Sequence, residues 1–192
     1  PVAQLFRLLS RSMRRLLPSF VLLALLSGCA NPAVEQTREL ETLFNEQLAA
    51  EDDGGAAAEL RAAVDERTDY DGAVRALFSD LADFIAAVEE REQALETAER
   101  EAALLQTELS EADPRAAKAA ALAAFSDAAA EIEAEFRRAT DELAPQILYG
   151  SRELRRFADW EPDPAGAVGQ ILLQLGEEEI LLFPDEAPGL QL

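Results

Sequence analysis

Residues 70–109 read YDGAVRALFSDLADFIAAVEEREQALETAEREAALLQTEL, and residues 114–143 read PRAAKAAALAAFSDAAAEIEAEFRRATDEL. In the first stretch apolar positions recur at alternating steps of four and three residues, with Arg91 as the one charged exception. A second set of apolar positions with this spacing runs from Leu122 to Leu143, and we call each set a stripe. Heptad stripes are typical of coiled coils, and a short connection makes two long helices antiparallel neighbours. The sequence therefore predicts a mainly α fold with a long antiparallel coiled-coil hairpin over 69–148, turning near 110–114.

The two stripes also predict which residues face each other. The expected pairs are Leu81 with Leu143, Phe84 with Ala139, Val88 with Phe136, Arg91 with Ile132, Leu95 with Ala129, Ala98 with Phe125, and Ala102 with Leu122. Large side chains oppose small ones in several of these layers, as close packing requires. Asp113-Pro114 supplies the start signal of the second helix, an N-cap residue followed by proline.

Two hairpin residues are candidates for more than packing. Arg91 occupies a stripe position, and the facing helix carries Glu131 and Glu135. It is either a recognition arginine or a polar residue that sets the register by reaching those glutamates, and we favour the second interpretation. Leu104 lies beside the stripe with nothing local to cover it, which makes it either a partner contact or an isolated surface leucine.

Short helices are expected to brace the open end of the hairpin. Asn31-Pro32 is a helix start signal, so a helix is predicted over about 32–50, followed by a shorter one over about 56–67. These helices would cover Phe78 and Ile85, which lie off the main stripe. Thr68 is expected to cap the long helix that follows.

The last segment, 149–192, is expected to be less regular. Pro145 and then Tyr149-Gly150 are predicted to end the second long helix. A short helix would follow and present Trp160 as a cap on the bundle core. The apolar run 179–183 fits a strand as well as a helix.

Composition excludes several classes of function. The 192 residues include 38 acidic and 17 basic side chains and no histidine, for a net charge of −21. This charge argues against nucleic-acid binding, and the missing imidazole excludes His-based catalysis and His-ligated metals. The stretch 68–72 superficially resembles a calcium loop, but Arg67 and Phe78 occupy positions that require carboxylates. We predict no enzyme activity, no metal and no small-molecule substrate.

The N-terminal segment 1–28 has the composition of an export signal. It carries four arginines and no acidic residue, and an apolar run over 16–26 is too short to span a membrane. A start at Met13 would leave a signal of 16 residues. The run ends in Leu26-Ser27-Gly28-Cys29, which resembles the lipobox of bacterial lipoproteins.

The resemblance implies a function for the only cysteine. It implies cleavage between Gly28 and Cys29 and covalent acylation of Cys29, so that 29–68 comprises the lipid anchor and the first short helices. Ala30 at the next position implies sorting to the periplasmic face of the outer membrane. Residues 29–192 would then carry 13 basic and 38 acidic side chains, a net charge of −25. Such a surface is expected to be repelled from anionic headgroups.

These observations predict a lipid-anchored envelope lipoprotein without enzyme activity. It would present a helical surface as a scaffold or accessory subunit to another envelope protein or to a second copy of itself. The alternative is an acidic periplasmic protein that captures cationic peptides, basic proteins or metal ions.

Overall fold

The computed structural model describes residues 31–50 and 55–182, and these form a mainly α fold without strands. The helices are α2 (Pro32–Ala49), α3 (Ala56–Glu66), α4 (Gly72–Leu109), α5 (Pro114–Thr140), α6 (Leu143–Ala158) and α7 (Ala167–Leu182). None of these helices combines the length and the apolar character needed to cross a bilayer. The predicted signal, Met13, and the lipobox with Gly28 and Cys29 lie outside the described residues.

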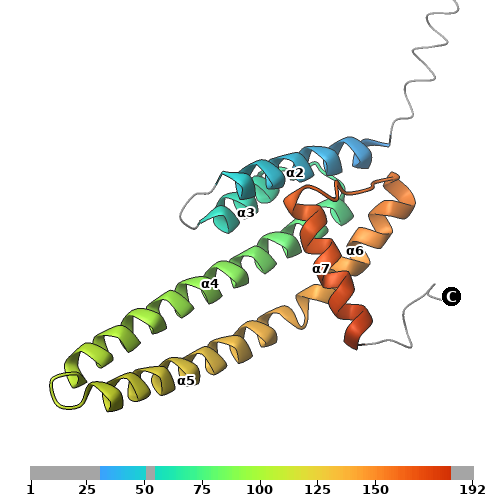
Figure 1. Ribbon diagram of the computed structural model, residues 1–192. Coiled ribbons are helices and arrows are strands. Elements are labelled where there is room, and N and C mark those ends of the chain that lie inside the picture. The colour runs from blue at the N-terminus through green and yellow to red at the C-terminus, as the bar shows by residue number, and fades with distance from the viewer. Residues whose placement is uncertain (1–30, 51–54, 183–192) are drawn as a thin grey trace, which may run out of the picture.

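Helices α4 and α5 run side by side in opposite directions and project from the other helices (Figure 1). Helix α4 contains 38 residues, which corresponds to a length of about 57 Å at 1.5 Å per residue. Asp113 caps α5 as predicted, because its carboxylate accepts hydrogen bonds from the backbone N–H groups of Arg115 and Ala116. The cap of α4 is Asp71, not the predicted Thr68.

The packing between α4 and α5 differs from the predicted pairs in two places. Near the turn, Leu122 is 60% exposed, whereas Ala117 and Ala121 are 0% and 5% exposed. The prediction that Leu122 faces Ala102 is therefore wrong. A straight α-helix drifts by about 20° per heptad, and small alanines allow the two backbones to approach closely, so the buried face of α5 shifts along the helix.

The second difference is at the end of the hairpin that lies away from the turn. Phe84 packs against Phe136, with ring centroids 6.4 Å apart, and its predicted partner Ala139 is exposed. Two aromatic rings at this separation are stabilised by a tilted ring–ring contact, which a phenylalanine and an alanine cannot form.

The main core lies where α2, α3, α6 and α7 surround the first half of α4. Phe78 and Ile85 are buried in this core, as predicted. Phe44 of α2 contacts Phe78 edge to face, with ring centroids 5.0 Å apart. Trp160 is 2% exposed and closes the core as expected, 6.3 Å from the Phe78 ring.

The C-terminal region is more regular than predicted. Helix α6 runs through Pro145 and Gly150 without a break. Pro145 is in the first turn, where no intrahelical N–H bond is required. Gly150 packs against α4, since a Cβ there would lie 3.5 Å from the Leu77 side chain, so this glycine is a packing residue and not a helix end. Helix α7 continues to Leu182, which makes residues 179–182 helical.

Candidate functional site

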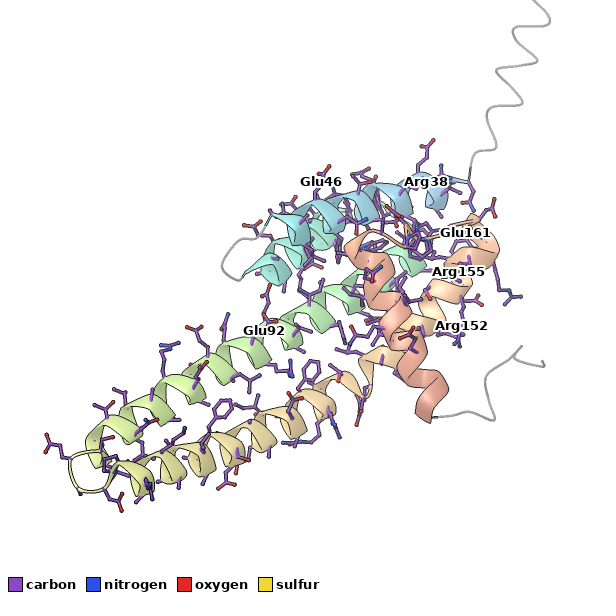
Figure 2. The ribbon with its side chains drawn as sticks, in the orientation of Figure 1. Arg38, Glu46, Glu92, Arg152, Arg155 and Glu161 are labelled. Carbon is purple, nitrogen blue, oxygen red and sulfur yellow. The ribbon has the colours of Figure 1, made fainter. Side chains whose placement is uncertain are left out.

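A groove lies between α4 and α5 on the hairpin. Figure 2 shows side chains from both helices meeting along this line. The groove has a volume of about 450 Å³, and a smaller hollow of about 90 Å³ adjoins it toward α6. Both are lined by Glu90, Ala94 and Ile132, so they form one continuous feature, which we call the hairpin groove.

The hairpin groove exists because alanines line it. Ala87, Ala94 and Ala98 contribute from α4, and Ala128 and Ala139 contribute from α5. A methyl side chain does not fill the space between two neighbouring helices, so a shallow apolar channel remains along the contact. Ile132 and Phe136 supply the larger apolar surface on the α5 side.

The walls of the hairpin groove are polar and mostly acidic, with Arg91 as the one cation among its lining residues. Glu90 and Glu101 line it from α4, and Glu135 lines it from α5. Gln93 and Thr97 complete the α4 wall. The groove therefore offers an apolar floor between carboxylates, which is complementary to a helix with one apolar stripe and flanking cations.

Leu104 lies closer to the turn than Glu101, the last α4 residue that lines the groove. It follows Thr97 by seven residues and Glu101 by three, and both spacings keep side chains on one face of a helix. Leu104 is 65% exposed, consistent with the prediction that nothing covers it. Leu122 is also exposed but lies six residues from Ala128 on α5, which places it on a different side of that helix from the groove.

Arg91 lines the smaller hollow of the groove and pairs across the hairpin with a glutamate that the sequence did not single out. Its Nε donates to Glu133 Oε1 across 2.8 Å, and its guanidinium carbon lies 5.3 Å from the centre of the Phe136 ring. The predicted pairing of Arg91 with Glu131 and Glu135 is therefore wrong. Each of these glutamates lies two residues from Glu133, and a separation of two residues places side chains on nearly opposite sides of an α-helix.

The Arg91–Glu133 pair changes the acidity of both groups. The hydrogen bond from Arg91 lowers the pKa of Glu133 below its usual value, and the same bond raises the pKa of Arg91. Both side chains remain about one-third exposed, so the pair fixes the register of the helices more than it stabilises them.

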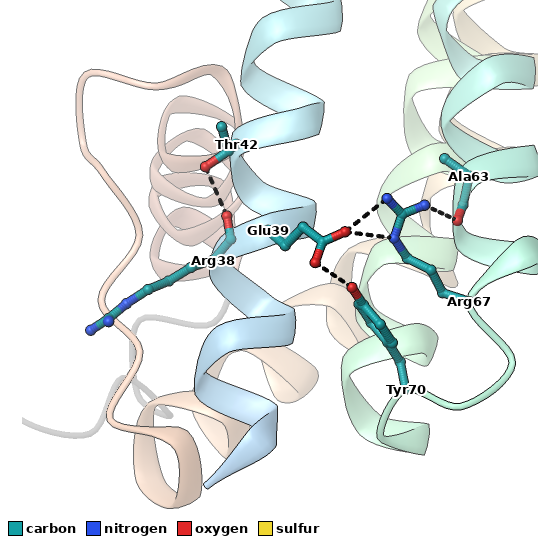
Figure 3. Close-up of polar contacts among 6 residues, drawn as sticks. All are labelled: Arg38, Glu39, Thr42, Ala63, Arg67 and Tyr70. Carbon is teal, nitrogen blue, oxygen red and sulfur yellow. Dashed lines mark hydrogen bonds and ion pairs between the residues drawn. The ribbon is translucent and has the colours of Figure 1, made fainter. Parts of the chain in front are cut away.

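A second polar cluster joins α2 to the connection between α3 and α4 (Figure 3). Arg67 donates to Glu39 Oε1 through Nε and Nη2, across 3.2 and 2.9 Å, and the Tyr70 hydroxyl donates to Glu39 Oε2. The hydrogen bond from Tyr70, followed by that from Arg67, lowers the pKa of Glu39. Burial, with the bond to Glu39, raises the pKa of Tyr70. Sequence reasoning missed this cluster, because about 30 residues separate its partners.

The described residues contain no group of three or more Asp, Glu or Cys side chains arranged to hold a metal ion. The acidic residues that line the hairpin groove are spread along two helices and do not converge on a point. No protein-family model matches the chain, and no curated protein or solved structure is similar to it.

Proposed function

We propose that this protein is a lipid-anchored envelope protein without enzyme activity whose hairpin binds a helical segment of another envelope protein. The observation that carries the proposal is the hairpin groove, which α4 lines as far as Glu101. Leu104, 65% exposed, follows on the same face of α4. A helix that lies in this groove would place its apolar stripe over the alanines and its larger residues against Ile132 and Leu104.

The lipid anchor on Cys29 is part of the proposal. Two or three acyl chains hold a protein stably at a bilayer through roughly 0.8 kcal/mol per buried methylene group. A Cys29→Ser variant should therefore leave the membrane fraction after cell lysis. Retention of that variant in the membrane fraction would remove the lipoprotein proposal.

The docking proposal is tested by photo-crosslinking in cells from a probe that replaces Leu104. A matched probe at Leu122 serves as control, since both leucines are exposed near the turn but only Leu104 shares a helix face with the groove-lining residues Thr97 and Glu101. We expect a discrete adduct of higher mass from position 104 and none from position 122. An adduct of twice the monomer mass identifies a second copy as the partner, whereas equal or absent adducts from the two positions contradict docking at the groove.

A second function is favoured by the acidic walls of the same groove. Glu90, Glu101 and Glu135 would attract cationic peptides or basic proteins without a fitted apolar contact. Binding of this kind weakens steeply with salt, because exposed charges are screened within about 10 Å at 0.1 M. Affinity that is insensitive to salt but lost in Leu104→Gln would favour the helix partner over this alternative.

A further inference from the structure

The carboxylates that line the hairpin groove are not neutralised by the chain itself. Glu90, Glu101 and Glu135 are exposed, and no basic side chain in the described part of the chain forms an ion pair with any of them. The one cation that lines the groove, Arg91, is already bound to Glu133. The groove therefore keeps negative charges that a cationic ligand can neutralise.

Two of these carboxylates lie at a defined spacing along the α4 wall. Glu90 and Glu101 both line the groove and are eleven residues apart (101 − 90). Eleven residues make about three turns of an α-helix, so the two side chains lie on one side of α4, about 16.5 Å apart along its axis. Gln93 and Thr97, which line the same wall between them, carry no charge. The α4 wall therefore presents two negative charges separated by uncharged polar groups.

The helices of a second copy of this chain do not match that pattern. Helix α4 contains three basic and nine acidic residues, a net charge of 3 − 9 = −6, so the groove would repel it. Helix α5 is neutral overall, but its four basic residues form two pairs near its ends: Arg115 with Lys118, and Arg137 with Arg138. These pairs are at least 19 residues apart (137 − 118), about 28 Å, and all four acidic residues of α5 lie between them. The charge pattern therefore favours a different protein as the occupant.

We propose that the occupant of the hairpin groove is an amphipathic helix of another protein that carries two Lys or Arg residues eleven positions apart. This inference rests on the proposed docking function and specifies its partner. The two cations would lie beside Glu90 and Glu101, and the apolar stripe of the partner helix would lie over the alanines and Ile132. Because both carboxylates are exposed, each ion pair contributes little to affinity, and the spacing acts mainly by selecting among helices.

The experiment measures the binding of two synthetic helical peptides to the purified full chain in a neutral detergent, by fluorescence anisotropy of the labelled peptides. Both peptides have about five helical turns, the same composition and the same leucine stripe. The matched peptide carries two lysines eleven positions apart on one flank of the stripe. In the shifted peptide the lysines are seven positions apart, which keeps them on the same flank but brings them to about 10.5 Å from each other.

We expect the matched peptide to bind about threefold more tightly than the shifted peptide, because only the matched lysines reach both carboxylates and the difference is one exposed ion pair. Glu101→Gln should make the two peptides bind equally, since each then keeps a single pair with Glu90. Glu99→Gln is the control, because Glu99 is an exposed glutamate of α4 that does not line the groove. This variant should keep the threefold preference.

Two results overturn the inference while leaving docking at the groove intact. One is equal binding of the two peptides to the unaltered chain, with weaker binding of both to Leu104→Gln. The other is loss of the preference in Glu99→Gln as well as in Glu101→Gln, which would indicate general attraction to an acidic helix.

Two further results assign the groove differently. If neither peptide binds and the chain sediments as a dimer, a second copy occupies the groove and the inference is wrong. If neither peptide binds to a chain that sediments as a monomer, the proposed docking function has failed together with the inference.

Discussion

Trp160 donates its indole N–H to Glu41 Oε2 across 2.7 Å, although 119 residues separate the two in sequence. The other carboxylate oxygen of Glu41 accepts the backbone N–H of Asp163, also across 2.7 Å. Glu41 is 8% exposed, so one buried carboxylate on α2 holds the connection between α6 and α7 against the bundle. This contact fixes the segment that follows the C-terminal end of α6.

The first prediction concerns this carboxylate. Glu41→Ala should lower the free energy of unfolding by about 2–3 kcal/mol, because the buried indole N–H of Trp160 and the part-buried N–H of Asp163 lose a charged acceptor. Denaturation in urea measures the change. Glu46→Ala is the matched control, since Glu46 is an exposed glutamate on the same helix, and its effect should stay within about 0.5 kcal/mol. Similar losses in the two variants would mean that the Trp160 contact does not stabilise the fold.

The second prediction concerns the partner of Arg91. A double-mutant cycle between Arg91→Ala and Glu133→Ala should give a favourable coupling energy, which is small because the ion pair is partly exposed. The same cycle with Glu131→Ala should give a coupling near zero, because Glu131 lies on a different side of α5. A larger coupling with Glu131 than with Glu133 would restore the pairing that the sequence alone suggested.

The third prediction is a pH dependence that arises from Glu39. Its pKa in the folded protein is lowered from the ordinary value of 4.5, chiefly by the hydrogen bond from Tyr70. Because the pKa is lower in the folded protein than in the unfolded chain, the charged carboxylate stabilises the fold at pH values above the ordinary pKa. This stabilisation is lost as the pH falls through the lower pKa of the folded protein. The free energy of unfolding, measured from pH 7 to pH 3, should therefore fall less steeply below about pH 4.5 in Glu39→Gln than in the unaltered protein.

The control for this titration is Glu35→Gln, which removes the same charge from α2 without touching Tyr70 or Arg67. Its pH profile should keep the steepness of the unaltered protein in the acid range. Parallel profiles for Glu39→Gln and the unaltered protein would show that the Tyr70 hydrogen bond does not persist in solution.

Local patterns in the sequence predicted most of the helices. The alternating spacing of four and three residues identified α4 and α5, because this spacing can be recognised in the sequence of one helix without knowledge of its partner. Asn31 and Asp113 were recognisable as caps for the same reason, since a cap acts within three residues. The continuity of α6 was missed because Pro145 and Gly150 also fit a helix end, and only the contact of Gly150 with α4 distinguishes the two cases.

Features that depend on two distant segments were not predictable. Glu41 and Trp160, or Glu39 and Tyr70, carry no sequence signal of their partnership. Alanine is so frequent in α5 that several faces of this helix are equally apolar, and the choice between them depends on how α4 approaches. The hairpin groove follows from that choice, so Leu104 was identified as exposed but the groove beside it was not.

The fourth prediction tests which face of α5 is buried. The heptad pattern assigns Leu122 to the contact with α4, whereas the structure buries Ala121 and leaves Leu122 60% exposed. Ala121→Leu should therefore lower the free energy of unfolding by about 1–3 kcal/mol, because the larger side chain forces the two helices apart. Leu122→Ala should change the free energy of unfolding by less than about 0.5 kcal/mol.

The heptad assignment gives the opposite expectation for these two variants. If Leu122 filled the contact, its truncation to alanine would cost about 2–5 kcal/mol, and Ala121→Leu would be tolerated on the surface. Chemical denaturation of the pair therefore decides between the two faces. The outcome also bears on function, because rotating α5 to bury Leu122 would change which residues of α5 line the hairpin groove, the surface on which the docking proposal depends.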